Sequence, residues 1–431
     1  MISHISISIT SHISISLSSF YHHHYNHTIF IIDITFIINN NIITTTTTIG
    51  DSDYHHITQC ENLEDFKLNL QETDYGQMLA NDTSVTPTII EARALEKLVT
   101  EFQYLKAQAV EPLATFLDYI TYEYMIENVM LLLRGTLSGR NVNELIAQCH
   151  PLGMFKESTM RNIPSFEANS RGYAELYETV LVDTPIGPYF QKYLDESQKS
   201  VSAASEVRNI LEEVQIEILK NALMKLYFED FYAFCEKMGG ETANIMCGLL
   251  RARADRNAIN ITLNSFGTPL NEPNMRETTR RNLYPAIGEL YPAGTELLVK
   301  VDEDSKLVQA LSYYSFYRGI NHYYFYYYYS NFTTNTIGIF EKFLNASPDE
   351  FSIDDEFYKG EVKLYELAFE SQMHFGVFYA FIKLKEQEIR NLVWISECIL
   401  QRRKDQIGHF IPIFSSSSEW RCESTRKSGA H

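Results

Sequence analysis

Residues 361–400, EVKLYELAFESQMHFGVFYAFIKLKEQEIRNLVWISECIL, form the longest helical pattern in the chain. Its apolar residues recur mostly at steps of three and four, which is the spacing of one helix face. If the pattern is unbroken, about 40 residues at ~1.5 Å each make a helix of roughly 60 Å. Gly376 is the position at which such a helix would bend or divide. The apolar residues of this pattern include Leu367, Met373, Val377, Phe381, Leu384, Ile389, Leu392, Ile395 and Ile399.

Helical spacing continues outward from this stretch. Residues 89–109 carry a second apolar stripe, and Glu111-Pro112 marks a new helix start because proline is tolerated in the first helical turn. Residues 216–238 are rich in aromatic side chains at helical spacing, so we interpret them as core packing and not as a ligand-stacking surface. The sequence therefore predicts an all-α fold over residues 58–413.

Three short segments resemble one another and suggest an internal repeat. They are centred on Asn128, Asn257 and Asn391, which are 129 and 134 residues apart. Near-equal spacing is typical of repeated structural units, although chance similarity is the alternative for matches of six residues. In a true repeat, each asparagine would lie inside a helix beside an apolar face. It would then be placed to hydrogen-bond a neighbouring helix end.

Composition excludes several classes of protein. The chain has 431 residues, of which 45% are hydrophobic and 21% charged, as expected for a globular protein of two or three domains. The net charge of -19 disfavours a nucleic-acid binder. Six cysteines without a CxxC pair indicate neither a zinc site nor a disulfide framework. No apolar run is long enough to predict a transmembrane helix. Two arginine clusters, interpreted as solvated helix faces, are Arg251, Arg253 and Arg256, and Arg276, Arg280 and Arg281.

No pattern of residues predicts catalysis, and no phosphate-binding loop, dinucleotide fingerprint or zinc-protease motif occurs. Cys149 and His150 are adjacent and precede a proline, so they are poorly placed as a nucleophile and base. His374 is interpreted as a satisfied structural histidine, and His22–His24 only as an adventitious metal binder. We therefore predict no catalytic, cofactor-binding or metal-binding residue. Neighbouring carboxylates, interpreted as solvated helix surface, are Glu212-Glu213, Glu229-Asp230, and Glu386 with Glu388.

A series of stretches in one order carries a family resemblance. They are residues 59–66 (QCENLEDF), 73–76 (TDYG), 111–120 (EPLATFLDYI), 149–155 (CHPLGMF), 180–185 (VLVDTP), 229–232 (EDFY), 254–256 (ADR), 261–268 (ITLNSFGT) and 387–398 (QEIRNLVWISEC). In these stretches the chain resembles the subunit d family of V-type proton ATPases, an AC39-like family of the V0 membrane sector. The resemblance covers roughly residues 58–413.

The resemblance implies a fold and a role. Members are all-helical, with three similar units arranged as a funnel, here roughly residues 58–165, 166–290 and 291–413. The implied role is mechanical and non-catalytic, coupling the central stalk to the proteolipid c-ring during proton transport. Implied partners are the stalk subunits, the c-ring and subunit a, on the cytoplasmic face of vacuolar or endosomal membranes. Membrane association would come through these partners alone, without cofactor or nucleic acid.

The chain departs from the family in four segments. Residues 1–57 are low-complexity sequence, residues 196–208 look like an addition, residues 319–338 look like an insertion, and residues 414–431 form an unrelated tail. Gene-model errors and lineage-specific insertions are the two explanations. Two alternatives to the rotary ATPase remain: a helical scaffold or adaptor outside these complexes, and an all-helical enzyme with a buried site.

Overall fold

The computed structural model describes residues 49–163, 176, 178, 181–199, 212–316 and 353–414. Helices are the regular elements of these residues, and no strand occurs among them. The predicted all-α fold is confirmed. Six long helices dominate: α5 (Pro87–Gln108), α6 (Leu113–Leu137), α11 (Glu212–Met238), α12 (Gly240–Ser265), α18 (Ile353–Ser371) and α19 (Gly376–Leu400).

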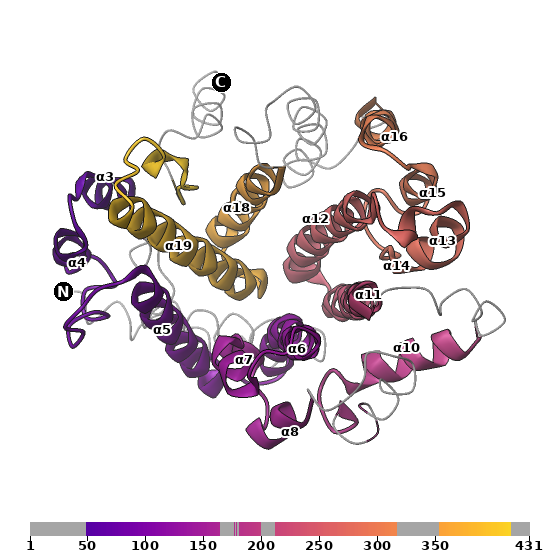
Figure 1. Ribbon diagram of the computed structural model, residues 1–431, viewed down its shortest axis with the longest axis horizontal. Coiled ribbons are helices and arrows are strands. Elements are labelled where there is room, and N and C mark those ends of the chain that lie inside the picture. Colours follow the sequence, from indigo (N-terminus) through magenta and orange to yellow (C-terminus); the bar gives the residue numbers. More distant parts are fainter. Residues whose placement is uncertain are drawn as a thin grey trace, which may run out of the picture.

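The six long helices follow one another around a ring, as Figure 1 shows. Helix α6 packs against α11, α12 against α18, and α19 against α5. Helices α11 and α12 also pack on each other, as do α18 and α19. Each long helix therefore has a side toward the ring's centre and a side toward the outer elements.

Local sequence sets where these helices begin and end. Thr86 caps α5 by accepting a hydrogen bond from the Ile89 amide, and Pro87 occupies the first turn. Gly239, with φ of 71°, separates α11 from α12. The 361–400 pattern divides, because Gln372 and Met373 have φ of 51° and 56° and reverse the chain between α18 and α19. An unbroken helix of roughly 60 Å is therefore not formed, and both halves bury apolar faces against each other.

One end of the ring is closed by aromatic side chains. Phe116, near the start of α6, lies 5.5 Å from the rings of both Phe231 of α11 and Phe375, the residue before α19. The Phe375 amide donates to Thr242 Oγ1 of α12 at 3.0 Å. The turns that join the long helices therefore lie at this end, and the aromatic side chains fill it with apolar surface.

Shorter helices surround the ring. Helices α3 and α4 lie outside α19, and α13 to α16 lie outside α12 (Figure 1). The remaining elements are α3 (Asp51–Gln59), α4 (Leu63–Leu70), α7 (Val142–Gln148), η2 (Pro151–Gly153), α8 (Glu157–Asn162), α10 (Gly187–Lys199), η7 (Pro269–Asn271), α13 (Pro273–Met275), the π-helical η8 (Arg276–Arg280), α14 (Arg281–Leu283), α15 (Ala293–Lys300), α16 (Asp304–Phe316) and η9 (Ile407–His409).

The folded region begins earlier than residue 58. Ile49, Tyr54 and Ile57 are buried in the core, the last two on α3. The Ile49 amide donates to Glu388 Oε1 at 2.6 Å, and Asn391 Nδ2 donates to the Tyr54 hydroxyl at 3.0 Å. The expectation that residues 1–57 stand outside the core is wrong for 49–57, because long-range contacts to α19 organise a segment that lacks a local pattern.

Several predicted features lie outside the described residues: residues 1–48 with His22–His24, residues 200–208, the insertion 319–338 and the tail from residue 415. Residues 196–199 complete α10. Among the described helices, none combines the length and the apolarity that a bilayer-spanning segment needs.

Candidate functional site

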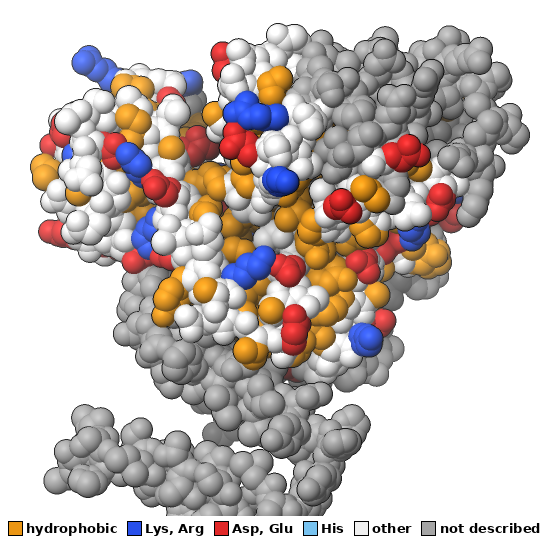
Figure 2. Space-filling view, turned by 90° about the horizontal axis from the view of Figure 1, so that it is seen from below, with side chains coloured by type: hydrophobic (Ala, Val, Ile, Leu, Met, Phe, Trp, Pro, Cys, Tyr) orange, Lys and Arg blue, Asp and Glu red, His pale blue; other side chains and the backbone are white. Residues whose placement is uncertain are grey.

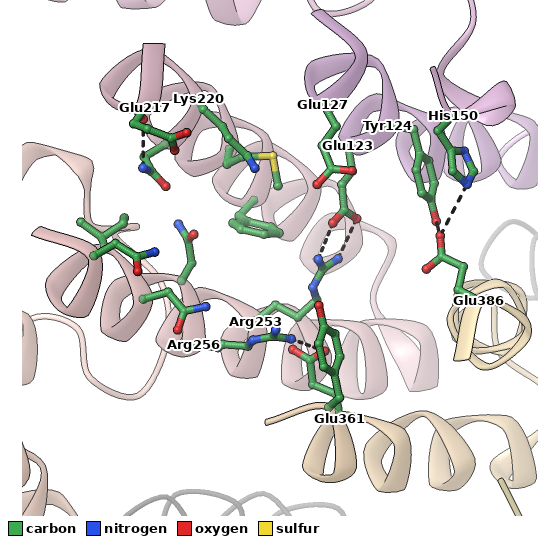
Figure 3. A pocket seen from close by; sticks show the side chains of 18 of the residues that line it. Glu123, Tyr124, Glu127, His150, Glu217, Lys220, Arg253, Arg256, Glu361 and Glu386 are labelled. Carbon is green, nitrogen blue, oxygen red and sulfur yellow. Dashed lines mark hydrogen bonds and ion pairs between the residues drawn. The ribbon is translucent and has the colours of Figure 1, made fainter. Parts of the chain in front are cut away.

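The inner faces of the six long helices enclose a cavity of 1090 Å³. The cavity lies in the half of the ring away from the Phe116, Phe231 and Phe375 cluster. The first residues that line it on α6 and α12 are Glu123 and Arg253, well beyond the starts of these helices near the cluster. Figure 3 shows charged side chains entering it from α6, α11, α12, α18 and α19. Six acidic and six basic side chains line it: Glu91, Glu123, Glu127, Glu217, Glu361, Glu386, Arg134, Lys220, Arg253, Arg256, Lys383 and Arg390.

One buried carboxylate joins three helices across the ring. Glu123 of α6 accepts two hydrogen bonds from the Arg253 guanidinium of α12, one of them at 2.7 Å from Nη1 to Oε2. Lys383 Nζ of α19 lies 3.2 Å from the same Oε2. Arg253 also donates to the Tyr379 hydroxyl at 2.6 Å. Helices that belong to distant parts of the sequence are therefore joined at one point, of which Figure 3 shows the contact between Glu123 and Arg253.

Electrostatics keeps this cluster ionised. Burial alone would raise the pKa of Glu123, but the charges of Arg253 and Lys383 outweigh it and hold that pKa well below its usual range. Burial would lower the pKa of Lys383, yet Glu123 and Glu386 raise it. Glu127, which faces the cavity, has its pKa raised by desolvation and by the nearby charge of Glu123. The cluster is thus a fixed set of paired charges and not a proton donor near neutral pH.

The arginines on α12 are not a solvated face. Arg256 forms an ion pair with Glu361 of α18 at 2.7 Å, and the side chain is only 14% exposed. The Tyr358 ring lies between the Arg256 and Arg390 guanidiniums, 4.4 and 4.5 Å from its centroid. The prediction is therefore wrong for Arg253 and Arg256, whose side of α12 faces the cavity, whereas Arg251 does not line the cavity and its side chain is 36% exposed.

Arg280, predicted on a solvated face, is also fully buried. Its Nη2 donates to the carbonyls of Leu298 and Val299 at 2.9 and 3.1 Å, and its Nη1 to Ser265 Oγ at 2.6 Å. These carbonyls belong to the last turn of α15, which the guanidinium therefore caps. Because these partners of Arg280 are backbone carbonyls, no pattern of charged residues in the sequence could predict its burial.

Cys149 and His150 do not form a nucleophile–base pair. Burial raises the pKa of the Cys149 thiol to about 11, and its Sγ donates to the Leu145 carbonyl at 3.4 Å. His150 stacks on Tyr124 with ring centroids 4.3 Å apart, and desolvation lowers its pKa. The Tyr124 hydroxyl donates to Glu386 Oε1 at 2.5 Å. These groups hold one another in place, and none is an activated nucleophile.

Two other predictions for single residues are corrected. Glu388 is fully buried and accepts hydrogen bonds from the Tyr75 hydroxyl and Lys385 Nζ, each at 2.9 Å, so it is not solvated helix surface. His374 is fully buried, but it is not the satisfied histidine that was predicted, because neither ring nitrogen has a hydrogen-bond partner among the described residues. Burial lowers the pKa of His374 to about 4, so the ring is neutral at pH 7.

The three repeated asparagines behave differently. Asn128 Nδ2 donates to the His150 carbonyl at 2.9 Å, and the His150 amide donates back to its Oδ1 at 2.7 Å. Asn391 holds Ile411 in the same way, at 2.6 and 3.1 Å. The expected bonding to helix ends is present at these two positions, beside η2 and η9. Asn257 makes no such pair in the described part of the chain: its Nδ2 is buried without a partner there, and the residue lines the cavity.

The cavity has the chemistry of a binding socket. Its main charges are paired within the wall, and no metal-binding group of three or more His, Cys, Asp or Glu gathers anywhere in the described ranges. Sequence reasoning missed Glu123, Arg253 and Lys383 as a group, and no local signal links them. On the outer face seen in Figure 2, charged side chains of both signs are scattered around hydrophobic ones.

Known proteins resemble this chain over most of its length. Residues 45–410 match the ATP synthase (C/AC39) subunit family. "V-type proton ATPase subunit d" of Dictyostelium discoideum is 43% identical over 364 residues, covering 84% of this chain and 90% of that protein. The Saccharomyces cerevisiae protein of the same name is 35% identical, covering 85% and 93%. "Probable V-type proton ATPase subunit d" of Oryza sativa subsp. japonica is 43% identical, covering 83% and 89%. The chain belongs to the ATP synthase (C/AC39) subunit family, among relatives named V-type proton ATPase subunit d.

Proposed function

We propose that the chain is a non-catalytic subunit of the V0 membrane sector of a V-type proton ATPase. It couples the central stalk to the proteolipid c-ring while ATP hydrolysis drives proton transport. The names of relatives at 35–43% identity over most of the chain support the assignment to this complex. Stalk, c-ring and subunit a are the partners we propose, on the cytoplasmic face of vacuolar or endosomal membranes.

The observation that carries the mechanical role is the braced cavity. A torque coupler needs a socket that keeps its shape under load, and close-packed helices provide stiffness. Glu123, Arg253 and Lys383 tie α6, α12 and α19 together around the cavity. Separating these charges inside the protein would leave them unpaired and desolvated, which is costly. The socket therefore resists opening when the inserted stalk is twisted.

The helix order also supports three related units arranged as a funnel. The second long helix of each unit packs on the first of the next: α6 on α11, α12 on α18, and α19 on α5. Cyclic packing of this kind is what three similar units would produce when they close on one another. We propose that the aromatic end faces the c-ring and that the cavity end receives the stalk.

Affinity purification tests this function. A tagged full-length chain is isolated from detergent-solubilised membranes of its own cells, and the co-purifying proteins are identified. We expect stalk subunits and proteolipids in fixed proportion to the chain. Recovery of a stable complex without any ATPase subunit would instead support a scaffold outside the rotary ATPases. An untagged strain controls for proteins that bind the resin.

A further inference from the structure

Two asparagines of the long helices hold peptide groups by the same pair of hydrogen bonds. Asn128 and Asn391 are almost fully buried, and each donates to a carbonyl and accepts from the amide of one residue, His150 or Ile411. In both cases the residue held comes directly before a proline. A carboxamide suits this task because it has both a donor and an acceptor on adjacent atoms.

Asn257 has the corresponding position on α12 but holds nothing. Its Nδ2 is buried and has no hydrogen-bond partner among the described residues. A buried amide without a partner costs free energy, and native structures rarely tolerate one without a reason. Asn257 lines the central cavity, so an occupant of the cavity is the partner that can relieve this cost.

Two further asparagines extend the feature along α12. Asn257, Asn260 and Asn264 all line the cavity, at spacings that put them on one helix face. Neither Asn260 nor Asn264 makes a side-chain hydrogen bond within the described ranges. By contrast, Arg253 and Arg256 on the same face are paired with carboxylates. The three residues, which we call the amide stripe, are thus a row of uncharged groups with free hydrogen-bonding capacity.

We propose that the amide stripe binds the peptide backbone at the end of a helix that the central stalk inserts into the cavity. The amide stripe would hydrogen-bond backbone groups of a second chain, as Asn128 and Asn391 hydrogen-bond backbone groups of their own chain. This inference rests on the proposed function, since it takes the stalk as the occupant. It adds which wall of the cavity makes the contact and which groups of the stalk are recognised.

The end of a helix matches the stripe in chemistry and size. The last turn of a helix leaves four carbonyls, and the first turn four amides, without partners inside the helix. These groups are polar but carry no full charge, and the same is true of the amide stripe. A cavity of 1090 Å³ holds roughly two turns of a helix about 10–12 Å wide. Because acidic and basic side chains around the cavity are equal in number, the wall has no net charge to select a charged occupant.

The test combines binding and stability of alanine variants in the full-length chain. Asn257→Ala, Asn260→Ala, Asn264→Ala and the triple variant are purified, and their affinity for the purified central-stalk subunits is measured. We expect the triple variant to bind about tenfold or more weakly, since each lost hydrogen bond weakens binding several-fold. The matched control is Asn244→Ala, which changes an exposed asparagine of α12 outside the cavity and should bind as wild type does.

Thermal unfolding of the same variants separates recognition from a structural role. Asn257→Ala removes an amide that has no partner among the residues the structure describes, so its unfolding midpoint should stay unchanged or rise. Asn128→Ala should lower the midpoint, because it leaves the amide and carbonyl of His150 without partners. A lower midpoint for Asn257→Ala, comparable to that of Asn128→Ala, would overturn the proposal.

The possible outcomes also separate a failure of the proposed function from a failure of the amide-stripe proposal. If the wild-type chain does not bind the stalk, the proposed function itself is wrong. If the wild-type chain binds the stalk and the folded triple variant binds equally well, the stalk uses another surface and only the amide stripe is rejected. Weaker stalk binding by the triple variant, together with an unfolding midpoint no lower than that of the wild type, is the result that supports the inference.

Discussion

At the scale of single residues, the feature that matters most is the placement of charge inside the ring. Glu123, Arg253 and Lys383 come from three helices, and Glu123 and Lys383 are buried while Arg253 is half-buried, yet each remains ionised because the others compensate its desolvation. A buried ion pair need not add net stability relative to an apolar pair. Removal of one member, however, leaves the remaining charges buried without compensation. These residues therefore fix the geometry of the cavity.

Glu123→Gln tests this placement directly. The substitution keeps the shape of the side chain but removes the negative charge that Arg253 and Lys383 share, so the free energy of unfolding should fall by about 3–5 kcal/mol. Urea denaturation followed by circular dichroism measures it. Glu157→Gln is the control, since its pair with Arg161 is largely exposed and should be worth about 1 kcal/mol or less. Equal effects of the two substitutions would contradict the bracing role.

His374 gives the chain a defined dependence on pH. Desolvation is the main cause that lowers its pKa from 6.5 to about 4, and the charge of Glu241 opposes it only in part. Between about pH 4 and pH 6.5, His374 therefore binds a proton in the unfolded chain but not in the folded chain. Stability is complete above about pH 6.5 and is lost as the pH falls toward 4, by up to about 3 kcal/mol.

His374→Leu should flatten this dependence. An apolar side chain leaves no unpartnered nitrogen and no group to protonate, so the variant should match or exceed wild-type stability at pH 7 and lose less of it at pH 5. Denaturation midpoints from pH 4.5 to 7.5 are the measurement. His409→Gln changes an exposed histidine and serves as the control. A wild-type slope in the His374→Leu variant would rule out this histidine as its source.

At the scale of elements, α3 shows how distant contacts recruit a segment with little pattern of its own. Tyr54 of α3 stacks on Phe410 at 4.8 Å and accepts a hydrogen bond from Asn391. Glu388 holds both the Ile49 amide and the Tyr75 hydroxyl. The outer helices of the N-terminal region are thus attached to α19 through buried polar groups as well as apolar packing.

Two truncations locate the true start of the fold. Deletion of residues 1–57 removes Ile49, Tyr54 and Ile57 from the core, which should cost about 4 kcal/mol or more in unfolding free energy. Deletion of residues 1–48 removes none of these contacts and should leave the denaturation midpoint close to that of the full chain. Urea unfolding of both forms is the measurement. Equal midpoints would mean that α3 contributes nothing to the core.

At the scale of the whole molecule, the cyclic order of helices creates two unlike ends. The turns between helices close one end with Phe116, Phe231 and Phe375, whereas the other half of the ring encloses the polar cavity. A body with two unlike ends can bind two unlike partners at once. This property agrees with the coupling role that we propose.

Binding to a bare membrane is not expected of such a body. The chain carries a net charge of -19, and anionic lipid headgroups repel negative charge. Purified protein mixed with vesicles of anionic phospholipid should remain at the bottom of a flotation gradient. Vesicles that contain the purified proteolipid ring should carry it upward. Tight flotation with plain vesicles would show that the chain has a lipid-binding surface of its own.

Local patterns in the sequence are enough to predict the helices and several of the positions where they begin and end. Apolar spacing and the Glu111-Pro112 start act within a few residues, so they can be recognised locally. The family could also be inferred, because its segments occur in order along the chain. No site residue was predicted, although Asn128, Asn257 and Asn391 were recognised as related positions, and two of them make the expected bonds.

Which polar helix faces meet depends on how the helices pack in three dimensions. Glu123 and Arg253 are 130 residues apart, and nothing in either helix indicates the other. A helix face that lines a polar cavity has the same periodic pattern as one that faces water, so Arg256 and Glu386 were assigned to solvent. Closure of the ring makes the difference, since it withdraws those faces from bulk water and forces their charges to pair. The site is therefore a property of the ring and not of any single helix.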